Sequence, residues 1–388
     1  MNSWNSQLFK TEGRARGIPN EILDNATKIA KQLKYAGLPP IFTLNHLSHL
    51  CGVKYSTLRH IVERKHNDDA YKVFKLKKSG VGFSDERVRF ISVPNSELFK
   101  VQRWIHNNIL KLIPAHENSF AFHSNGGILK AAYPHCNKKW MIKLDVSNYF
   151  ESILEPTVYN AFLKMGYEPL VSFELARICT RVKPHHNPVK KNRINWLLNT
   201  DLPYKTIEIG HLPQGAPTSP LLSNVCSIKL DELLSDFADL NNLTYTRYAD
   251  DIVFSSADFF NRDLCNGYIK SVYSIMRENN LWPNRTKTKI IPPGARKIVL
   301  GLLVDTDRPR LTKEYKKEIL THLYYIFNES IGLEKHCKAR GFDSVYGFLN
   351  FINGKLTYAN FIDPEWSKPL IYKLKCVARP YIDLDSSC

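Results

Sequence analysis

Three aspartates stand where apolar, strand-like segments end or are interrupted, and acidic side chains are unusual at such places. Asp250 and Asp251 lie between TYTRY and IVFSS, and Asp145 ends the segment MIKLD. A buried carboxylate pair is costly unless a positive charge neutralises it. A divalent metal ion can do so, and Mg²⁺ prefers oxygen ligands, with phosphate completing its coordination shell.

If these two segments are neighbouring strands, the three carboxylates converge on one site. Such a site can hold two Mg²⁺ ions about 3.5–4 Å apart, with Mn²⁺ able to substitute. One ion then activates an attacking hydroxyl and the other stabilises the leaving oxygen. Because neighbouring strand residues point to opposite faces, Asp250 and Asp251 can both reach shared ions only at a hairpin turn.

Each of these acidic residues also has an ordinary structural explanation. Asp68 and Asp69 form another acidic pair in a polar turn, so the pair alone carries little information. Only the apolar flanks favour a site at 250–251. Asp145 precedes VSNYFESI and is also a reasonable helix cap, a role that does not exclude metal binding.

The segment LPQGAPTSP, residues 212–220, lies between these carboxylates in the sequence. Its glycine and three prolines favour an extended backbone that another group can approach closely. An amphipathic helix is expected directly after it. The alternative is an ordinary loop that precedes a helix.

The charge of the chain indicates the kind of partner. Its 388 residues suit two or three domains, and 54 Lys and Arg against 37 Asp and Glu give a net charge of +17. This excess predicts attraction to a polyanion, and nucleic acid is the first candidate. The alternative is a soluble protein that is merely basic.

The same sequence excludes several classes of protein. No apolar run approaches the ~20 residues of a membrane span, and the N-terminus lacks an apolar signal segment. The eight cysteines are scattered without a Cys-x-x-Cys pair, which predicts reduced thiols, not disulfides or a zinc site. We therefore expect a cytoplasmic protein with no membrane partner.

Hydrophobic periodicity predicts the elements that position these residues. Helices are expected over 20–36, with Asn20 as cap, and over 43–64, as two short helices around Gly52 with Ser56 capping the second. The pair at 43–64 fits either a DNA-reading helix-turn-helix or a small helical cap that reads no bases. Further expected elements are a hairpin over 71–94, a helix over 96–113, a strand over 140–146, a hairpin around 248–251 and one strand over 298–304.

The segments 311–327 and 344–361 combine lysines with aromatic residues, which suits charge contact and stacking on nucleic acid. The alternative is that the aromatic residues form a helical core, and we expect this for most of Tyr324, Tyr325, Phe327, Tyr346 and Phe348.

Taken together and in order, the motifs resemble those of reverse transcriptases of the bacterial retron and group II intron type. The likeness covers roughly residues 43–360. LDVSNYF resembles palm motif A, LPQGAPTSP motif B, RYADD motif C and NRTKTKI motif D. Three further segments resemble family elements: RFISVP and VQRWI in the fingers, and IVLGLLV after motif D.

This resemblance implies an α+β right-hand polymerase, in which a palm with an antiparallel sheet lies between fingers and a helical thumb. Residues 1–70 would form an N-terminal helical extension and 71–290 the fingers and palm. Residues 291–388 would form a thumb that binds RNA.

The resemblance also implies roles for individual residues. Asp145 and Asp250 would ligate both metal ions, with Asp251 as a supporting carboxylate. Phe150 would stack under the incoming sugar and exclude a 2′-hydroxyl, and Tyr248 would pack against the primer end or template. For both aromatics, plain core packing is the alternative. The remaining implied contacts are to the nucleotide: Gln214 and Gly215 would line its pocket, Arg89 with Lys77 or Lys78 would hold the triphosphate, and Lys287 would lie near the leaving pyrophosphate.

The implied activity is RNA-directed DNA synthesis from dNTPs, templated and primed by a structured non-coding RNA that stays joined to its DNA product. Such retron products, called msDNA, would serve antiviral defence together with an effector or toxin protein. Two signatures depart from the retron pattern: Ala131 stands where an Asn is usual, and Val299-Leu300-Gly301 replaces Val-Thr-Gly. A non-retron defence reverse transcriptase therefore stays open. Two proteins of other classes also stay open. One is an RNA-dependent RNA polymerase, which the aromatic side chain of Phe150 disfavours, and the other is a nucleic-acid-binding regulator with an inactive polymerase fold.

Overall fold

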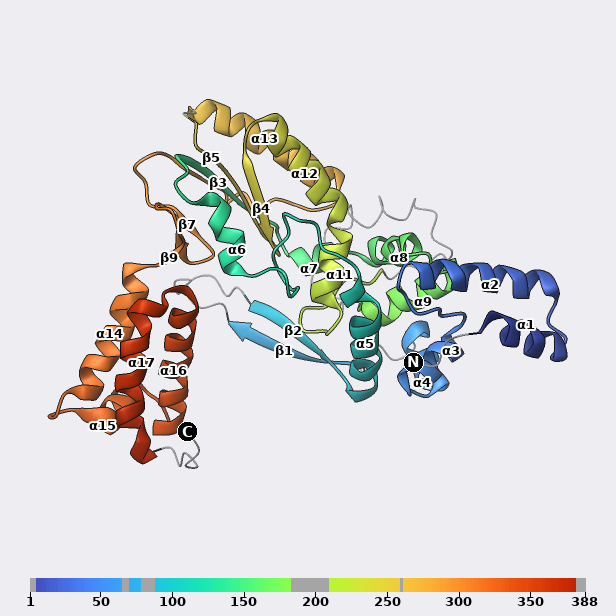
Figure 1. Ribbon diagram of the computed structural model, residues 1–388, viewed down its shortest axis with the longest axis horizontal. Helices are drawn as coiled ribbons and strands as arrows, with labels where there is room; N and C mark the ends of the chain where they lie inside the picture. The colour runs from blue at the N-terminus through green and yellow to red at the C-terminus, as the bar shows by residue number, and fades with distance from the viewer. Residues whose placement is uncertain (1–4, 65–69, 78–87, 183–208, 259–260, 382–388) are drawn as a thin grey trace.

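The computed structural model describes residues 5–64, 70–77, 88–182, 209–258 and 261–381. Figure 1 shows an elongated molecule with N-terminal helices at one end, a sheet and a hairpin in the middle, and a helical bundle at the other end. The named strands pair only antiparallel and pack together with helices, which confirms the α+β class. The loop of the first hairpin, including Lys78, lies outside the described residues.

Four helices precede the first strand: α1 (Ser6–Ala15), α2 (Asn20–Tyr35), α3 (Leu44–Cys51) and α4 (Tyr55–Glu63). The expected helices are confirmed, but two caps are wrong. Asn20 is already helical, after Pro19, and Lys54 occupies the cap position expected of Ser56. Helix α4 buries Leu58 and packs on the helices that follow, which anchors this region to the body of the molecule.

The fingers-like hairpin pairs β1 (Tyr71–Lys77) with antiparallel β2 (Val88–Pro94). Helix α5 (Ser96–Asn108) follows, and the Asn95 side chain caps it by accepting from the Leu98 N–H. This helix ends at Asn108 and not at 113, because a short 3₁₀ turn, η1 (Leu110–Leu112), takes over.

The central sheet has four strands in the order β4-β5-β3-β6, and all neighbours are antiparallel. Its bounds are β3 (Trp140–Asp145), β4 (Thr244–Tyr248), β5 (Asp251–Ser256) and β6 (Lys289–Ile291). Strands β3 and β5 therefore place two of the predicted carboxylates in neighbouring strands.

Helices pack with this sheet around a core that includes Leu144, Ile252 and Phe254, and they extend from the sheet towards the N-terminal helices (Figure 1). They are α6 (Ile128–Ala132), α7 (Tyr149–Ser152), α8 (Glu155–Lys164), α9 (Pro169–Cys179), α11 (Ser219–Cys226), α12 (Ile228–Leu240) and α13 (Arg262–Glu278). A short 3₁₀ helix, η2 (Tyr133–His135), precedes β3.

The C-terminal region begins with a small sheet of β7 (Ile298–Val299), β8 (Leu302–Leu303) and β9 (Arg310–Leu311). The expected single strand over 298–304 is wrong: Leu300 and Gly301 both have positive φ and turn the chain into a hairpin. A helical bundle follows, formed by α14 (Lys313–Phe327), α15 (Gly332–Ala339), α16 (Val345–Ile362) and α17 (Pro364–Ala378), then η3 (Arg379–Tyr381).

The five aromatic residues of this bundle that we expected mostly to be buried are mostly exposed. Phe348 is fully buried, but Tyr324 is 65% and Tyr346 60% exposed, and Tyr325 and Phe327 are also exposed. The prediction that most of these five form a core is therefore wrong. Among the described helices, none combines the length and the apolar character needed to cross a membrane.

Candidate active site

The turn between β4 and β5 carries the acidic pair. Strand β4 ends at Tyr248 and β5 begins at Asp251, so Ala249 and Asp250 form the two-residue turn of a hairpin. Ala249 has a φ of 55°, the positive value that tight hairpin turns require. Asp251 lies opposite Asp145 in the β3–β5 register, and the Asp250 carbonyl accepts from the Val146 N–H at 2.9 Å. The three aspartates are thus brought to one end of the sheet.

Asp145 is buried, and both of its carboxylate oxygens have partners. Asn284 Nδ2 donates to Oδ1 at 3.0 Å, and Lys287 Nζ donates to Oδ2 at 2.6 Å. The Asn284 N–H also donates to the Asp145 carbonyl at 2.7 Å. The segment resembling motif D therefore lies directly over this carboxylate, and its Lys287 pairs with Asp145. Its predicted place near the pyrophosphate stays a prediction.

The electrostatics of the site reflect crowded negative charge. Burial raises the pKa of Asp250, and Asp145 raises it further, while Lys287 and Arg89 oppose the shift. Burial likewise raises the pKa of Asp251, with a smaller contribution from Asp250. A cation bound here would relieve both the repulsion and the loss of solvation.

The donor set suits a hard divalent cation, since it consists of carboxylate oxygens and already binds one ammonium group. However, among the described residues no three or more His, Cys, Asp or Glu side chains form a ready-made metal site. Asp145 is instead held by Asn284 and Lys287. The sharing of two ions by the three aspartates therefore stays a prediction.

Phe150 and Tyr248 flank this end of the sheet. Phe150 is half-buried, with its ring 5.6 Å from that of Tyr149 and 6.1 Å from that of Phe122. Tyr248 is half-buried against the core and pairs with Asp251 in the β4–β5 register. Both residues also contact the core, so packing accounts for part of each side chain.

The loop resembling motif B is held against the hairpin β1–β2. The Ser92 N–H donates to the Gln214 carbonyl at 2.7 Å. Gly215 has a φ of +109°, and a Cβ there would lie 2.9 Å from Ile91 Cγ2 and 3.0 Å from the Ser92 carbonyl oxygen. Arg89 is exposed on β2 and near enough to affect Asp250. Lys77 ends β1 opposite Val88.

A buried ion pair that was not predicted from the sequence lies next to the β4–β5 turn. Arg247 is fully buried on β4, and its Nη2 lies 2.6 Å from Oδ2 of Asp231 on α12. The signal for Arg247 was present, because an arginine within the apolar strand TYTRY must have an anionic partner if it is buried. Nothing in the sequence singles out Asp231 among the acidic residues of its helix.

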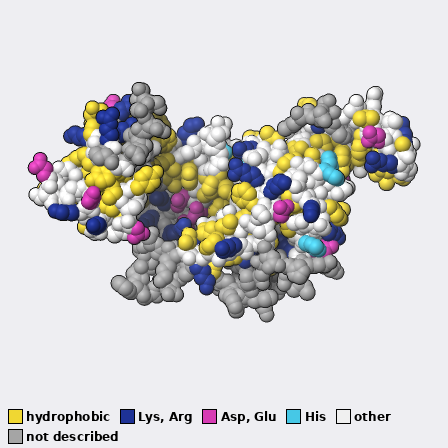
Figure 2. Space-filling view, turned by 90° about the horizontal axis from the view of Figure 1, so that it is seen from below, with side chains coloured by type: hydrophobic (Ala, Val, Ile, Leu, Met, Phe, Trp, Pro, Cys, Tyr) yellow, Lys and Arg dark blue, Asp and Glu magenta, His cyan; other side chains and the backbone are white. Residues whose placement is uncertain are grey.

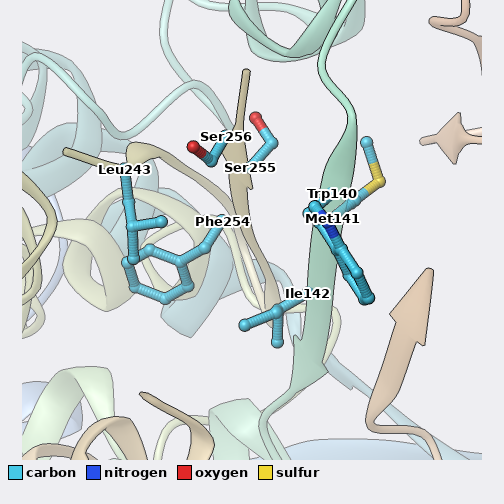
Figure 3. A pocket seen from close by; sticks show the side chains of 7 residues that line it. All are labelled: Trp140, Met141, Ile142, Leu243, Phe254, Ser255 and Ser256. Carbon is cyan, nitrogen blue, oxygen red and sulfur yellow. The ribbon is translucent and has the colours of Figure 1, made fainter. Parts of the chain in front are cut away.

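Figure 2 shows a hollow between the C-terminal bundle and the centre of the molecule, with acidic side chains in it and Lys and Arg nearby. A separate small apolar pocket, lined by Trp140, Phe254 and Ser256 among others, lies between β3 and β5 (Figure 3). It is at the opposite end of these strands from Asp145 and Asp251, so it is not the nucleotide site.

Comparison with known proteins agrees with this geometry. The family model described as reverse transcriptase (RNA-dependent DNA polymerase) matches residues 76–314, more than half of the chain. The Ec86 retron reverse transcriptase of Escherichia coli is 28% identical over 353 residues, covering 89% of this chain and 97% of its own. The Mx65 retron reverse transcriptase of Myxococcus xanthus is 27% identical, covering 95% of this chain and 79% of its own.

A solved structure of telomerase from Candida albicans, in complex with a fragment of telomeric RNA, aligns with 81% of this chain and 64% of its own. The TM-score is 0.39 at 12% sequence identity. The family match, together with the antiparallel palm sheet, confirms the right-hand polymerase fold. The chain belongs to the reverse transcriptase family and is an RNA-directed DNA polymerase of the bacterial retron type.

Proposed function

We propose that this reverse transcriptase copies a dedicated, structured non-coding RNA into msDNA. The observation that carries the proposal is the set of retron reverse transcriptases that match most of the chain, one of them over 97% of its own length. The RNA would supply both the template and a priming 2′-hydroxyl, and dNTPs would be the second substrate.

Asp145, Asp250 and Asp251 would hold two Mg²⁺ ions, with Mn²⁺ able to substitute. When bound, the ions would supply charge neutralisation for the primer hydroxyl and the leaving pyrophosphate. Lys287, which contacts Asp145 in this structure, would contact the leaving pyrophosphate as negative charge develops there. The remaining nucleotide contacts would be Arg89, Lys77 and Lys78 to the triphosphate, and Gln214 and Gly215 to the pocket.

Phe150 would select deoxynucleotides. Its ring is partly exposed next to the strand that ends in Asp145, and an aromatic ring against C2′ leaves no room for a hydroxyl. Tyr248 would contact the primer end. In the thumb, the exposed rings of Tyr324 and Tyr346 would stack on RNA while nearby lysines contact its backbone.

The biological role in this proposal is antiviral defence in the cytoplasm, in which the RNA–DNA product controls an effector or toxin protein. The second candidate is a defence reverse transcriptase that is related to the retron enzymes but makes no msDNA, and the replaced signatures at Ala131 and at Val299-Leu300-Gly301 favour it. The regulator with an inactive polymerase fold is disfavoured because all three aspartates are present at one end of the sheet.

Two experiments test the proposal. In primer extension on an RNA template with Mg²⁺, we expect Asp250→Asn with Asp251→Asn to abolish synthesis, whereas Asp239→Asn, at an exposed site on α12, retains it. Synthesis that survives the double substitution would disprove the site. Sequencing of the copurifying nucleic acid tests the retron role: a covalent RNA–DNA hybrid supports it, and long repetitive or untemplated DNA supports the second candidate.

A further inference from the structure

The backbone of Phe122 is held in an unusual conformation next to the proposed sugar gate. Its φ is 69°, in a region that bulky residues rarely adopt, and its side chain is 39% exposed. The ring centroid lies 6.1 Å from that of Phe150, with the two planes tilted by 42°. Such a conformation persists only where the surroundings enforce it, and it often marks a functional position.

Hydrogen bonds fix the loop that carries Phe122 to strand β4, which leads to the turn that carries Asp250. The Arg247 N–H donates to the Asn118 carbonyl at 2.8 Å, and the Phe120 N–H donates to the Arg247 carbonyl at 2.9 Å. From α11, Asn224 Nδ2 donates to the Ala121 carbonyl at 2.7 Å. The residue before Phe122 is thus anchored from a helix, and the loop as a whole from β4.

The buried guanidinium of Arg247 connects this loop to the gate and to the turn. It donates to Ser119 Oγ at 2.9 Å, to the Tyr149 hydroxyl at 2.9 Å and to the Ala249 carbonyl at 3.1 Å. Asp231 holds the guanidinium through two further bonds of 2.7 and 2.6 Å. One charged group therefore fixes the relative positions of the Phe122 loop, the Tyr149–Phe150 segment and the turn that carries Asp250.

We infer that Phe122 is a positioning residue for nucleotide selection, which backs the Phe150 ring so that this ring can exclude a 2′-hydroxyl. The inference rests on the gate role proposed for Phe150. If the Phe150 ring could move away from the sugar, it would discriminate poorly between dNTP and rNTP, because a small displacement of the ring would make room for the 2′-hydroxyl. Phe122 limits that displacement from the loop side, and the bonds of Arg247 keep the loop in place.

The test is to measure kcat/KM for dNTP and for rNTP on one RNA template-primer. Phe122→Asn removes the ring but keeps a residue that tolerates positive φ. We expect discrimination against rNTP to fall by about tenfold, the scale of a lost hydrophobic contact in a substrate pocket. Phe122→Tyr should preserve discrimination. Tyr133→Asn, which removes an aromatic ring that is 60% exposed on η2, is the matched control and should leave it unchanged.

The melting temperature separates this role from a purely structural one. Because Asn suits positive φ better than Phe, we expect Phe122→Asn to melt no lower than the parent protein. If instead it melts lower and slows dNTP and rNTP incorporation equally, so that their ratio is unchanged, Phe122 is only structural and the inference is overturned.

Phe150→Ala distinguishes failure of the inference from failure of the gate itself. If Phe150→Ala lowers discrimination, Phe122→Asn should add nothing in that background, because the two residues act through one ring. An equal effect of Phe122→Asn in both backgrounds would overturn the inference and leave the gate intact. No effect of Phe150→Ala would overturn the gate, and the inference with it.

Discussion

Negative charge at the β4–β5 turn, which carries Asp250 and Asp251, is only partly balanced by the protein's own cations. The pKa values of Asp250 and Asp251 are raised by burial and by neighbouring carboxylates, although Lys287 opposes both shifts. Lys287 itself is half-exposed and bonds to Asp145, which is buried. An ammonium group on a flexible side chain can leave when another cation arrives, so Lys287 both stabilises the site and competes for it.

This competition gives a testable result for Lys287→Met. Without the ammonium group at 2.6 Å, Asp145 keeps its bond from Asn284 but loses its charge partner. We expect Mn²⁺ to bind the nucleotide-free protein more tightly by titration calorimetry, while primer extension slows by about a hundredfold because a cationic contact to the pyrophosphate is lost. Lys289→Met, at an exposed position on β6, is the control. Weaker Mn²⁺ binding in Lys287→Met would contradict the competition.

His135 makes the stability of the palm depend on pH. It is fully buried, and its Nδ1 and Nε2 bond to Ser255 Oγ at 2.6 Å and Thr246 Oγ1 at 2.7 Å. Burial lowers its pKa to about 3. As the pH falls below about 6.5, His135 therefore takes up a proton in the unfolded chain but not in the folded protein. Neutral His135 thus stabilises the folded state fully above pH 6.5, and this contribution is lost as the pH falls towards 3.

Between pH 6.5 and 3, we expect the free energy of unfolding to fall by up to about 1.4 kcal/mol for each pH unit. Urea unfolding at pH 7 and pH 5 measures it. His135→Gln should be less stable at pH 7 and lose less stability between these two values. His60→Gln, at an exposed site on α4, should lose as much as the parent protein. Equal pH dependence of His135→Gln and the parent would contradict the assignment.

At the scale of elements, the motif B loop can contact strand β2 because Gly215 has no Cβ atom. Gly215 combines positive φ with a close approach to β2, where a Cβ would meet Ile91 Cγ2 at 2.9 Å and the Ser92 carbonyl oxygen at 3.0 Å. A methyl group there would strain the backbone and push the loop away from the fingers hairpin. Since Gln214 lies in the same loop, we expect the nucleotide pocket to be displaced as well.

Gly215→Ala should therefore lower both stability and activity. We expect a loss of about 1–3 kcal/mol in urea unfolding, the range for strained backbone positions, and a higher KM for dNTP. Gly267→Ala is the matched control, because that glycine lies in α13 with no heavy atom within 4 Å of its Cβ position. An alanine there should be neutral or stabilise the helix by up to about 1 kcal/mol. Equal effects of the two substitutions would refute the close-contact argument.

Elements with strong periodicity could be predicted, and their ends and contacts could not. The strand predicted over 140–146, which ends one residue earlier at Asp145, and the hairpin around 248–251 follow from apolar patterns that a carboxylate interrupts. The cap at Ser56 and the single strand over 298–304 were wrong because local geometry decides them, and Leu300 adopts positive φ without a sequence signal. The bond of Asn284 to Asp145 joins residues 139 positions apart, which no local pattern can specify.

At the scale of the whole molecule, a buried charge cluster ties the N-terminal helices to the palm. Glu155, at the start of α8, accepts hydrogen bonds from Arg64 after α4 and from the Gly210 N–H at 3.1 Å. It also forms an ion pair with Arg177 on α9, whose Nε lies 2.9 Å from Glu155 Oε1. Arg64 also donates to Thr180 Oγ1 at 2.9 Å. One carboxylate thus joins the N-terminal helices, two palm helices and the segment that leads into motif B.

Glu155→Gln tests whether this cluster makes the N-terminal helices and the palm one cooperative unit. The substitution takes the Glu155 anion away from the buried guanidinium groups of Arg64 and Arg177. We expect the free energy of unfolding to fall by about 3–5 kcal/mol. Calorimetry should show a single transition at lower temperature, because the helices and palm share the core that contains Leu58 and Leu175. Asp24→Asn, which breaks the exposed pair with Lys10, should not shift the transition. A separate early transition in Glu155→Gln would instead mean that the N-terminal helices dock on an independently stable palm.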